Sequence, residues 1–102
     1  MDTTQKYTRQ QIFELLGHAI NRSLKASGKQ AVSLSWDMKP LLAIADLDSQ
    51  MGVEVTLELE LALGVAIDLG TNLLIEDSGA TPRARKVKET VSAILSTLGG
   101  SS

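Results

Sequence analysis

Apolar residues near the start of the chain recur at the spacing of a helix that buries one face. The set is Ile12, Leu16, Ala19, Ile20 and Leu24, and most of the polar residues between them fall on the opposite side. Thr8 is followed three residues later by Gln11, which is the spacing of a capping box at a helix N-terminus. Ser27 and Gly28 form a stop signal. The pattern therefore predicts a helix from Thr8 to about Ser27.

A second helical pattern lies near the end of the chain. Thr81 and Pro82 predict its start, because a capping residue followed by proline is a typical first turn. Gly99 and Gly100 predict its end. The apolar positions between these signals are Val87, Val91, Ile94, Leu95 and Leu98. We expect one domain over residues 8–98, with flexible ends at residues 1–7 and 99–102.

The connection after the first helix, residues 28–47, has a mixed pattern. Residues 31–36 are compatible with a short strand or an ordered loop. Pro40 is disfavoured inside a helix but favours the start of a turn, here over residues 40–45. We expect the connection to be held against the core by the apolar residues Leu41, Leu42, Ile44 and Leu47.

The segment 53–69 carries two conflicting signals. Apolar residues occupy every second position, which is typical of a half-buried strand: Val53, Val55, Leu57, Leu59, Leu61, Leu63, Val65, Ile67 and Leu69. The abundance of Leu, Glu and Ala favours a helix instead, and the run is longer than the usual strand of about five or six residues. A helix here would carry apolar residues around most of its circumference. Such a helix is either deeply buried or offers an apolar face to a partner.

Composition excludes several classes of protein. The net charge of −2 argues against a strongly basic nucleic-acid binder, and the lack of cysteine excludes disulfides and thiolate chemistry. His18 is the only histidine, and we expect it to be a partly buried helix residue and not part of a metal site. The longest apolar stretch, 61–67, is too short to span a bilayer. We expect a cytoplasmic monomer that binds neither nucleic acid nor membrane.

Asp48 and Ser49 are common residues at the start of a helix, but the residues that follow them form a longer motif. Val53-Glu54-Val55, Leu59-Glu60, Leu63-Gly64-Val65 and Ile67 come after the pair in fixed register. This register resembles the attachment site and second helix of the acyl carrier protein family. The resemblance implies an all-α, four-helix bundle with a long first loop and an extended segment before the last helix. It favours a helix over residues 49–63, ended by Gly64 and followed by extended residues 65–67.

The resemblance also implies a function, which is that of a carrier and not of an enzyme. A phosphopantetheinyl transferase would attach 4'-phosphopantetheine to Ser49, and Asp48 would assist that step. The attached thiol would carry acyl intermediates for fatty-acid, polyketide or related biosynthesis. The second helix would dock onto the transferase and onto acyl-transferring or condensing enzymes. The residues expected at that docking surface are Gln50, Met51, Val53, Glu54, Val55 and Glu60.

Two alternatives follow from departures from the family pattern. Gln50 stands where the family has a leucine after the serine. Together with the period-two run, this favours an unmodified interaction module with the same or a mixed α+β fold. The period-two run over 53–69 favours a small strand-containing domain that binds other proteins.

The segment 68–86 is longer than the family's usual link to the last helix. Within it, we expect residues 71–77 to form one helical turn.

Overall fold

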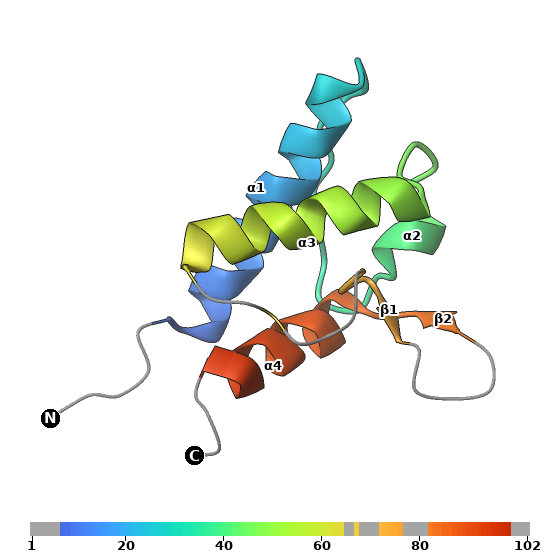
Figure 1. Cartoon of the computed structure of the whole chain (residues 1–102). Coiled ribbons are helices and arrows are strands. Elements are labelled where there is room, and N and C mark those ends of the chain that lie inside the picture. The colour runs from blue at the N-terminus through green and yellow to red at the C-terminus, as the bar shows by residue number, and fades with distance from the viewer. Residues whose placement is uncertain (1–6, 65–66, 68–71, 77–81, 99–102) are drawn as a thin grey trace, which may run out of the picture.

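Helices make up most of the structure, a computed structural model that describes residues 7–64, 67, 72–76 and 82–98 (Figure 1). Its elements are α1 (Arg9–Ala26), α2 (Pro40–Ala43), α3 (Ser49–Leu63), β1 (Ile75–Glu76), β2 (Arg83–Ala84) and α4 (Val87–Leu98). The predicted helical class is therefore confirmed. The ends predicted to be flexible lie outside the described residues, except that Tyr7 is partly buried and packs against the core.

The first helix begins and ends where the sequence predicts. The Thr8 hydroxyl accepts a hydrogen bond from the Gln11 N–H at 3.1 Å, and the Gln11 side chain accepts one from the Thr8 N–H at 2.8 Å. This capping box satisfies two backbone donors that a helix leaves without partners at its start. Ser27 is the C-cap, and Gly28 follows with a φ of +78°. The positions predicted to be apolar and inward are all buried: Ile12, Leu16, Ala19, Ile20 and Leu24.

The conflict over residues 53–69 is resolved in favour of helix for the part that the structure describes. In α3, a step of two residues turns about 200° around the axis, so an alternating pattern divides between two faces. Val55, Leu59 and Leu63 are buried, whereas Leu57 and Leu61 are exposed. The alternative that requires an extended segment here is wrong over residues 53–63.

Gly64 ends α3 in a left-handed conformation with a φ of +74°, as the sequence predicts. The Glu60 side chain then accepts a hydrogen bond from the Ile67 N–H at 2.9 Å. Ile67 itself is buried. The prediction that residues 65–67 are extended concerns a segment of which residues 65 and 66 lie outside the described part of the chain.

The long connection from residue 28 to residue 39 follows α1 as an ordered loop without a strand. Asn21 holds it by bonding both the N–H and the carbonyl oxygen of Val32, at 2.7 and 2.9 Å. The ring of Trp36 stacks on that of Phe13, with centroids 4.4 Å apart, and the Arg9 guanidinium lies 5.2 Å from the Trp36 ring. Together these contacts fix a segment that has few regular backbone hydrogen bonds of its own.

Among the four apolar residues expected to anchor this connection, one differs from the prediction. Ile44 and Leu47 are buried and Leu41 is partly buried, but Leu42 is 73% exposed. Leu42 lies within α2, a helix of one turn, and such a short helix directs only part of its circumference toward the core.

The last helix begins five residues later than Thr81 and Pro82 predict. Residues 83–84 instead pair with β1 as an antiparallel strand, with Ile75 opposite Ala84 and Glu76 opposite Arg83. Carbonyl groups of the first loop complete the start of α4, because Val87 N–H bonds to Met38 O and Lys88 N–H to Trp36 O at 2.8 and 2.9 Å. These long-range partners replace a local capping residue.

The predicted helical turn over residues 71–77 is not found in its described part, residues 72–76. A reverse turn forms instead, closed by a hydrogen bond from the Ile75 N–H to the Asn72 carbonyl at 3.1 Å, and β1 follows it directly. The turn buries the side chains of Leu73 and Leu74 completely.

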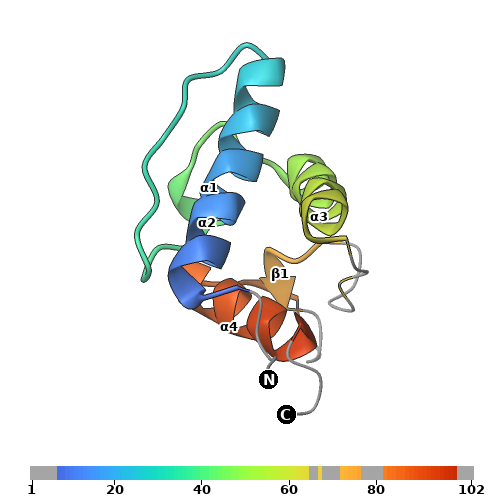
Figure 2. The same cartoon turned by 90° about the vertical axis from the view of Figure 1, so that its left-hand side faces the viewer.

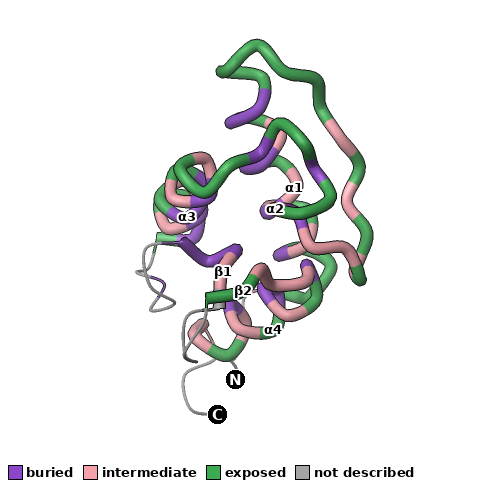
Figure 3. Tube along the Cα trace, turned by 90° about the vertical axis from the view of Figure 1, so that its right-hand side faces the viewer, coloured by how far each residue is buried: buried purple, intermediate pink, exposed green. Residues whose placement is uncertain are grey.

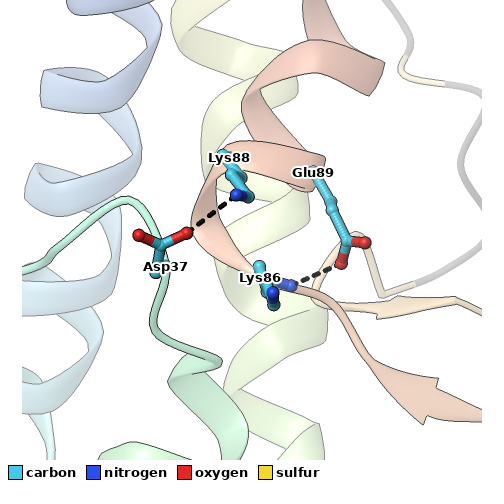
Figure 4. A network of polar contacts seen from close by, with 4 residues as sticks. All are labelled: Asp37, Lys86, Lys88 and Glu89. Atoms are coloured by element: carbon cyan, nitrogen blue, oxygen red, sulfur yellow. Dashed lines mark hydrogen bonds and ion pairs between the residues drawn. The ribbon is translucent and has the colours of Figure 1, made fainter.

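An exposed ion pair also joins the first loop to the start of α4 (Figure 4). Lys88 Nζ lies 2.8 Å from Asp37 Oδ1, and the Glu89 side chain accepts a hydrogen bond from the Lys86 N–H at 2.8 Å. The hydrogen bond and positive charge of Lys88 hold the pKa of the Asp37 carboxyl below its ordinary value. Because both side chains are in solvent, the pair contributes little to stability.

The core lies between α1, α3 and α4, with α3 and α4 both packed against α1 (Figure 2). Buried positions recur on the sides of these helices that face one another (Figure 3). Leu73 and Leu74 complete the core from the segment between α3 and α4. Among the described helices, none is long and apolar enough to cross a membrane.

Candidate functional site

Ser49 is the first residue of α3 and is exposed. Asp48 precedes it in an extended conformation, and its carboxylate accepts a hydrogen bond from the Met51 N–H at 2.9 Å. The structure therefore gives Asp48 a defined local role as the N-cap of the helix.

Replacing Asp48 by alanine is expected to destabilise the protein by about 1 kcal/mol, because the capping hydrogen bond to Met51 is lost. Asp48→Asn is the matched control, since an asparagine oxygen accepts the same bond without the charge. Chemical denaturation measures the difference. Equal stability of Asp48→Ala and the wild type would show that the cap contributes nothing.

The geometry of Ser49 fits the attachment of a phosphodiester. The hydroxyl lies at the N-terminus of a 15-residue helix, where the helix dipole and backbone N–H groups favour negative charge. Ser49 is exposed, so the residue is accessible from solvent. The negative charge of Asp48 opposes this effect in part, and its carboxylate already accepts the hydrogen bond of the Met51 N–H.

Beneath Ser49, a buried polar network ties the start of α3 to the segment 72–74. The Asn72 side-chain amide donates to the Ser49 carbonyl oxygen at 2.9 Å and accepts from the Leu74 N–H at 2.9 Å. The Thr56 hydroxyl donates to the Gly52 carbonyl at 2.8 Å and accepts from the Leu73 N–H at 2.9 Å. Sequence analysis missed this network, because it depends on contacts between residues far apart in the chain.

The residues expected at the docking surface do not all reach the surface. Gln50 and Glu54 are exposed, and Met51, Val53 and Glu60 are partly buried. Glu54 also accepts a hydrogen bond from the Ser23 hydroxyl at 3.0 Å. Val55 is fully buried in the core, so it cannot contact a partner in this structure. Position after the serine placed Val55 on the wrong side of the helix.

Two exposed leucines occupy the outer face of α3 instead. Leu57 is 56% exposed and Leu61 is 85% exposed, and they lie four residues apart on the same side of the helix. They line an open groove together with Arg22, Glu54, Glu58 and Ala62. A salt bridge of 2.8 Å between Arg22 and Glu58 crosses from α1 to α3. The excess of apolar residues around α3 was the sequence signal for this face.

His18 lies exposed on α1, and not partly buried as its position in the first helix suggests. It borders a shallow depression between α1 and the first loop, which Phe13, Asn21 and Leu34 also line. Over the described ranges, no three His, Cys, Asp or Glu side chains come together in a way that could hold a metal ion.

Comparison with models of protein families, with curated proteins and with solved structures found no match to this chain. What the site does is therefore inferred from its own residues and their arrangement.

Proposed function

We propose that this chain is an acyl carrier protein that bears 4'-phosphopantetheine on Ser49. The observation that carries the proposal is the placement of Asp48 and Ser49. The pair begins a long helix that buries one face in the core, presents the other to solvent and follows a long first loop. In this proposal the chain is a carrier that enzymes act on, and has no catalytic activity of its own.

Each residue at the site has a part in this function. The Ser49 hydroxyl would lose its proton, and its oxygen would bond to the phosphorus of the phosphopantetheine part of coenzyme A. The pyrophosphate P–O bond would break, and adenosine 3',5'-bisphosphate would leave. The exposure of Ser49 allows a transferase to reach it. Asp48 keeps the first turn of α3 formed by capping the Met51 N–H. The bound group would supply the thiol that the chain lacks, since the sequence has no cysteine.

The outer face of α3 is the proposed docking surface for the transferase and for acyl-transferring or condensing enzymes. Gln50, Glu54, Leu57 and Leu61 are its exposed residues. A partner that offers apolar side chains flanked by basic ones would complement two leucines and a glutamate. Val55 is not part of this docking surface, because it is buried in the core.

The proposal is tested by incubating the protein with coenzyme A, Mg²⁺ and a broad-specificity phosphopantetheinyl transferase. Intact mass spectrometry is expected to show a gain of one phosphopantetheine on the wild-type protein. A panel of transferases that all leave the mass unchanged would contradict the proposal.

The second candidate is an unmodified interaction module. Gln50, exposed directly after Ser49, and the exposed pair Leu57 and Leu61 favour it. The two leucines line one open groove, and apolar surface that is contiguous in this way can mark a binding face. The two candidates differ in one result, because an interaction module binds its partner through α3 without gaining any mass from coenzyme A.

A further inference from the structure

Asn72 links residues 72–74 to Ser49, the residue proposed for modification. The residue is buried, with 9% of its surface exposed. The amide nitrogen donates to the Ser49 carbonyl and the amide oxygen accepts from the Leu74 N–H, each at 2.9 Å. A carbonyl oxygen requires a donor and an N–H requires an acceptor, so only one orientation of the amide satisfies both contacts. An asparagine side chain, which offers both a donor and an acceptor, therefore satisfies both backbone groups.

Gly52 provides the space for that side chain. A Cβ built at Gly52 would lie 2.6 Å from Asn72 Cγ, far inside van der Waals contact. Glycine inside a helix is less favourable than alanine by about 1 kcal/mol. Only a glycine at position 52 allows Asn72 to approach the first turns of α3 this closely.

Hydrogen bonds join residues 72–74 to α4 as well as to α3. The Thr56 hydroxyl bridges the Gly52 carbonyl and the Leu73 N–H, and the Thr90 hydroxyl donates to the Leu73 carbonyl at 3.3 Å. Thr56 and Thr90 are both buried. A buried network whose polar groups all have hydrogen-bond partners favours a single arrangement of its side chains. The Asn72 side chain is therefore held in one position.

We propose that Asn72 is a positioning residue for the modification of Ser49. The first turn of a helix is prone to fray. Here it is held on one side by Asp48 bonding the Met51 N–H, and on the other by Asn72 bonding the Ser49 carbonyl. Together they fix the backbone from which the Ser49 hydroxyl projects, although the side chain itself is exposed. Group transfer is sensitive to such placement. This inference rests on the proposed function.

Asn72→Ala is expected to lower kcat/KM for loading by a transferase about tenfold, mainly through kcat, because the attacking oxygen is less well placed. It is also expected to speed hydrogen exchange at the amides of Met51 and Gly52 by about tenfold, through easier opening of the first turn. Asn21→Ala is the matched control. Asn21 also donates to one backbone group and accepts from another, in this case both of Val32, but it lies outside the network around Asn72. The loading rate of folded Asn21→Ala should therefore be unchanged.

A double variant separates positioning from stability. In Asn72→Ala with Gly52→Ala, the new methyl group occupies space that the amide has left, and alanine favours the helix. Stability is expected to recover relative to Asn72→Ala while loading stays slow. Loading at the wild-type rate in the double variant would overturn the positioning role, as would unchanged amide exchange in Asn72→Ala. Failure of the wild-type protein to load would instead overturn the proposed function, and Asn72's role in loading with it.

Discussion

Leu59→Ala is expected to lower the free energy of unfolding by about 2 to 5 kcal/mol, the usual cost of removing a buried leucine side chain. Leu59 is 1% exposed and belongs to the core between α1, α3 and α4. The substitution removes apolar contacts and leaves a cavity that rigid neighbours on three helices fill only in part. Urea unfolding followed by far-UV circular dichroism measures the loss.

Leu61→Ala is the matched control for this prediction, since the same substitution is made two residues along the same helix. Leu61 is 85% exposed, so the change should stay within about 0.5 kcal/mol. An alternating strand would place Leu59 and Leu61 on one face and give both substitutions a similar cost. Similar losses at the two positions would therefore contradict the helix that the structure assigns to this segment.

The second large effect is expected from Ser49→Ala, which should abolish loading with phosphopantetheine. The substitution removes the only atom of Ser49 that can receive the group. The Asp48 cap and the hydrogen bond from Asn72 both involve other atoms and remain. Unfolding free energy should therefore stay within about 0.5 kcal/mol of the wild-type value. Intact mass and urea unfolding on the same sample separate the two effects.

Ser92→Ala is a suitable control, because Ser92 is an exposed serine on α4 that the proposal does not involve. It should load as fully as the wild-type protein. Mass gain by Ser49→Ala would disprove the assignment of the site. Unfolding of Ser49→Ala would show that the side chain has a structural role that its exposed position does not explain.

Local sequence signals predicted the elements whose causes are local. The capping box at Thr8 and the repeat from Ile12 to Leu24 are properties of neighbouring residues, and α1 follows both. In contrast, the alternation of apolar residues in α3 is the pattern of a strand, and on its own it favours a strand where the structure has a helix. Resemblance to a family favoured the helix. The burial of Leu59 beside the exposure of Leu61 shows how a helix accommodates that run.

Local sequence signals do not predict features that depend on contacts between residues far apart in the chain. Thr81 and Pro82 form a plausible helix start, but carbonyl groups of Met38 and Trp36 set the start of α4 at Val87. The hydrogen bond that the Asn72 side chain donates to the Ser49 carbonyl joins residues 23 positions apart in the chain. No spacing rule predicts such a pair, although a glycine inside a helix at position 52 was a visible sign of close packing.

The start of α3 at Asp48 and Ser49 agrees with the sequence prediction, whereas the placement of Val55 on the surface was wrong. Asp48 and Ser49 lie at the start of a helix, as their residue types favour. Val55 was assigned to the docking surface by its distance from Ser49, but the buried face of α3 includes it. Leu57 and Leu61 occupy the exposed face, and only knowledge of which side packs on α1 distinguishes the two sets.

The central claim is that Ser49 carries the prosthetic group, and mapping the modification within the chain tests it most directly. The wild-type protein would be treated with coenzyme A, Mg²⁺ and a transferase, digested, and its peptides sequenced by tandem mass spectrometry. We expect one phosphopantetheine per chain, attached to Ser49. A modification at any other residue, or full recovery of the unmodified peptide that contains Ser49, would contradict it.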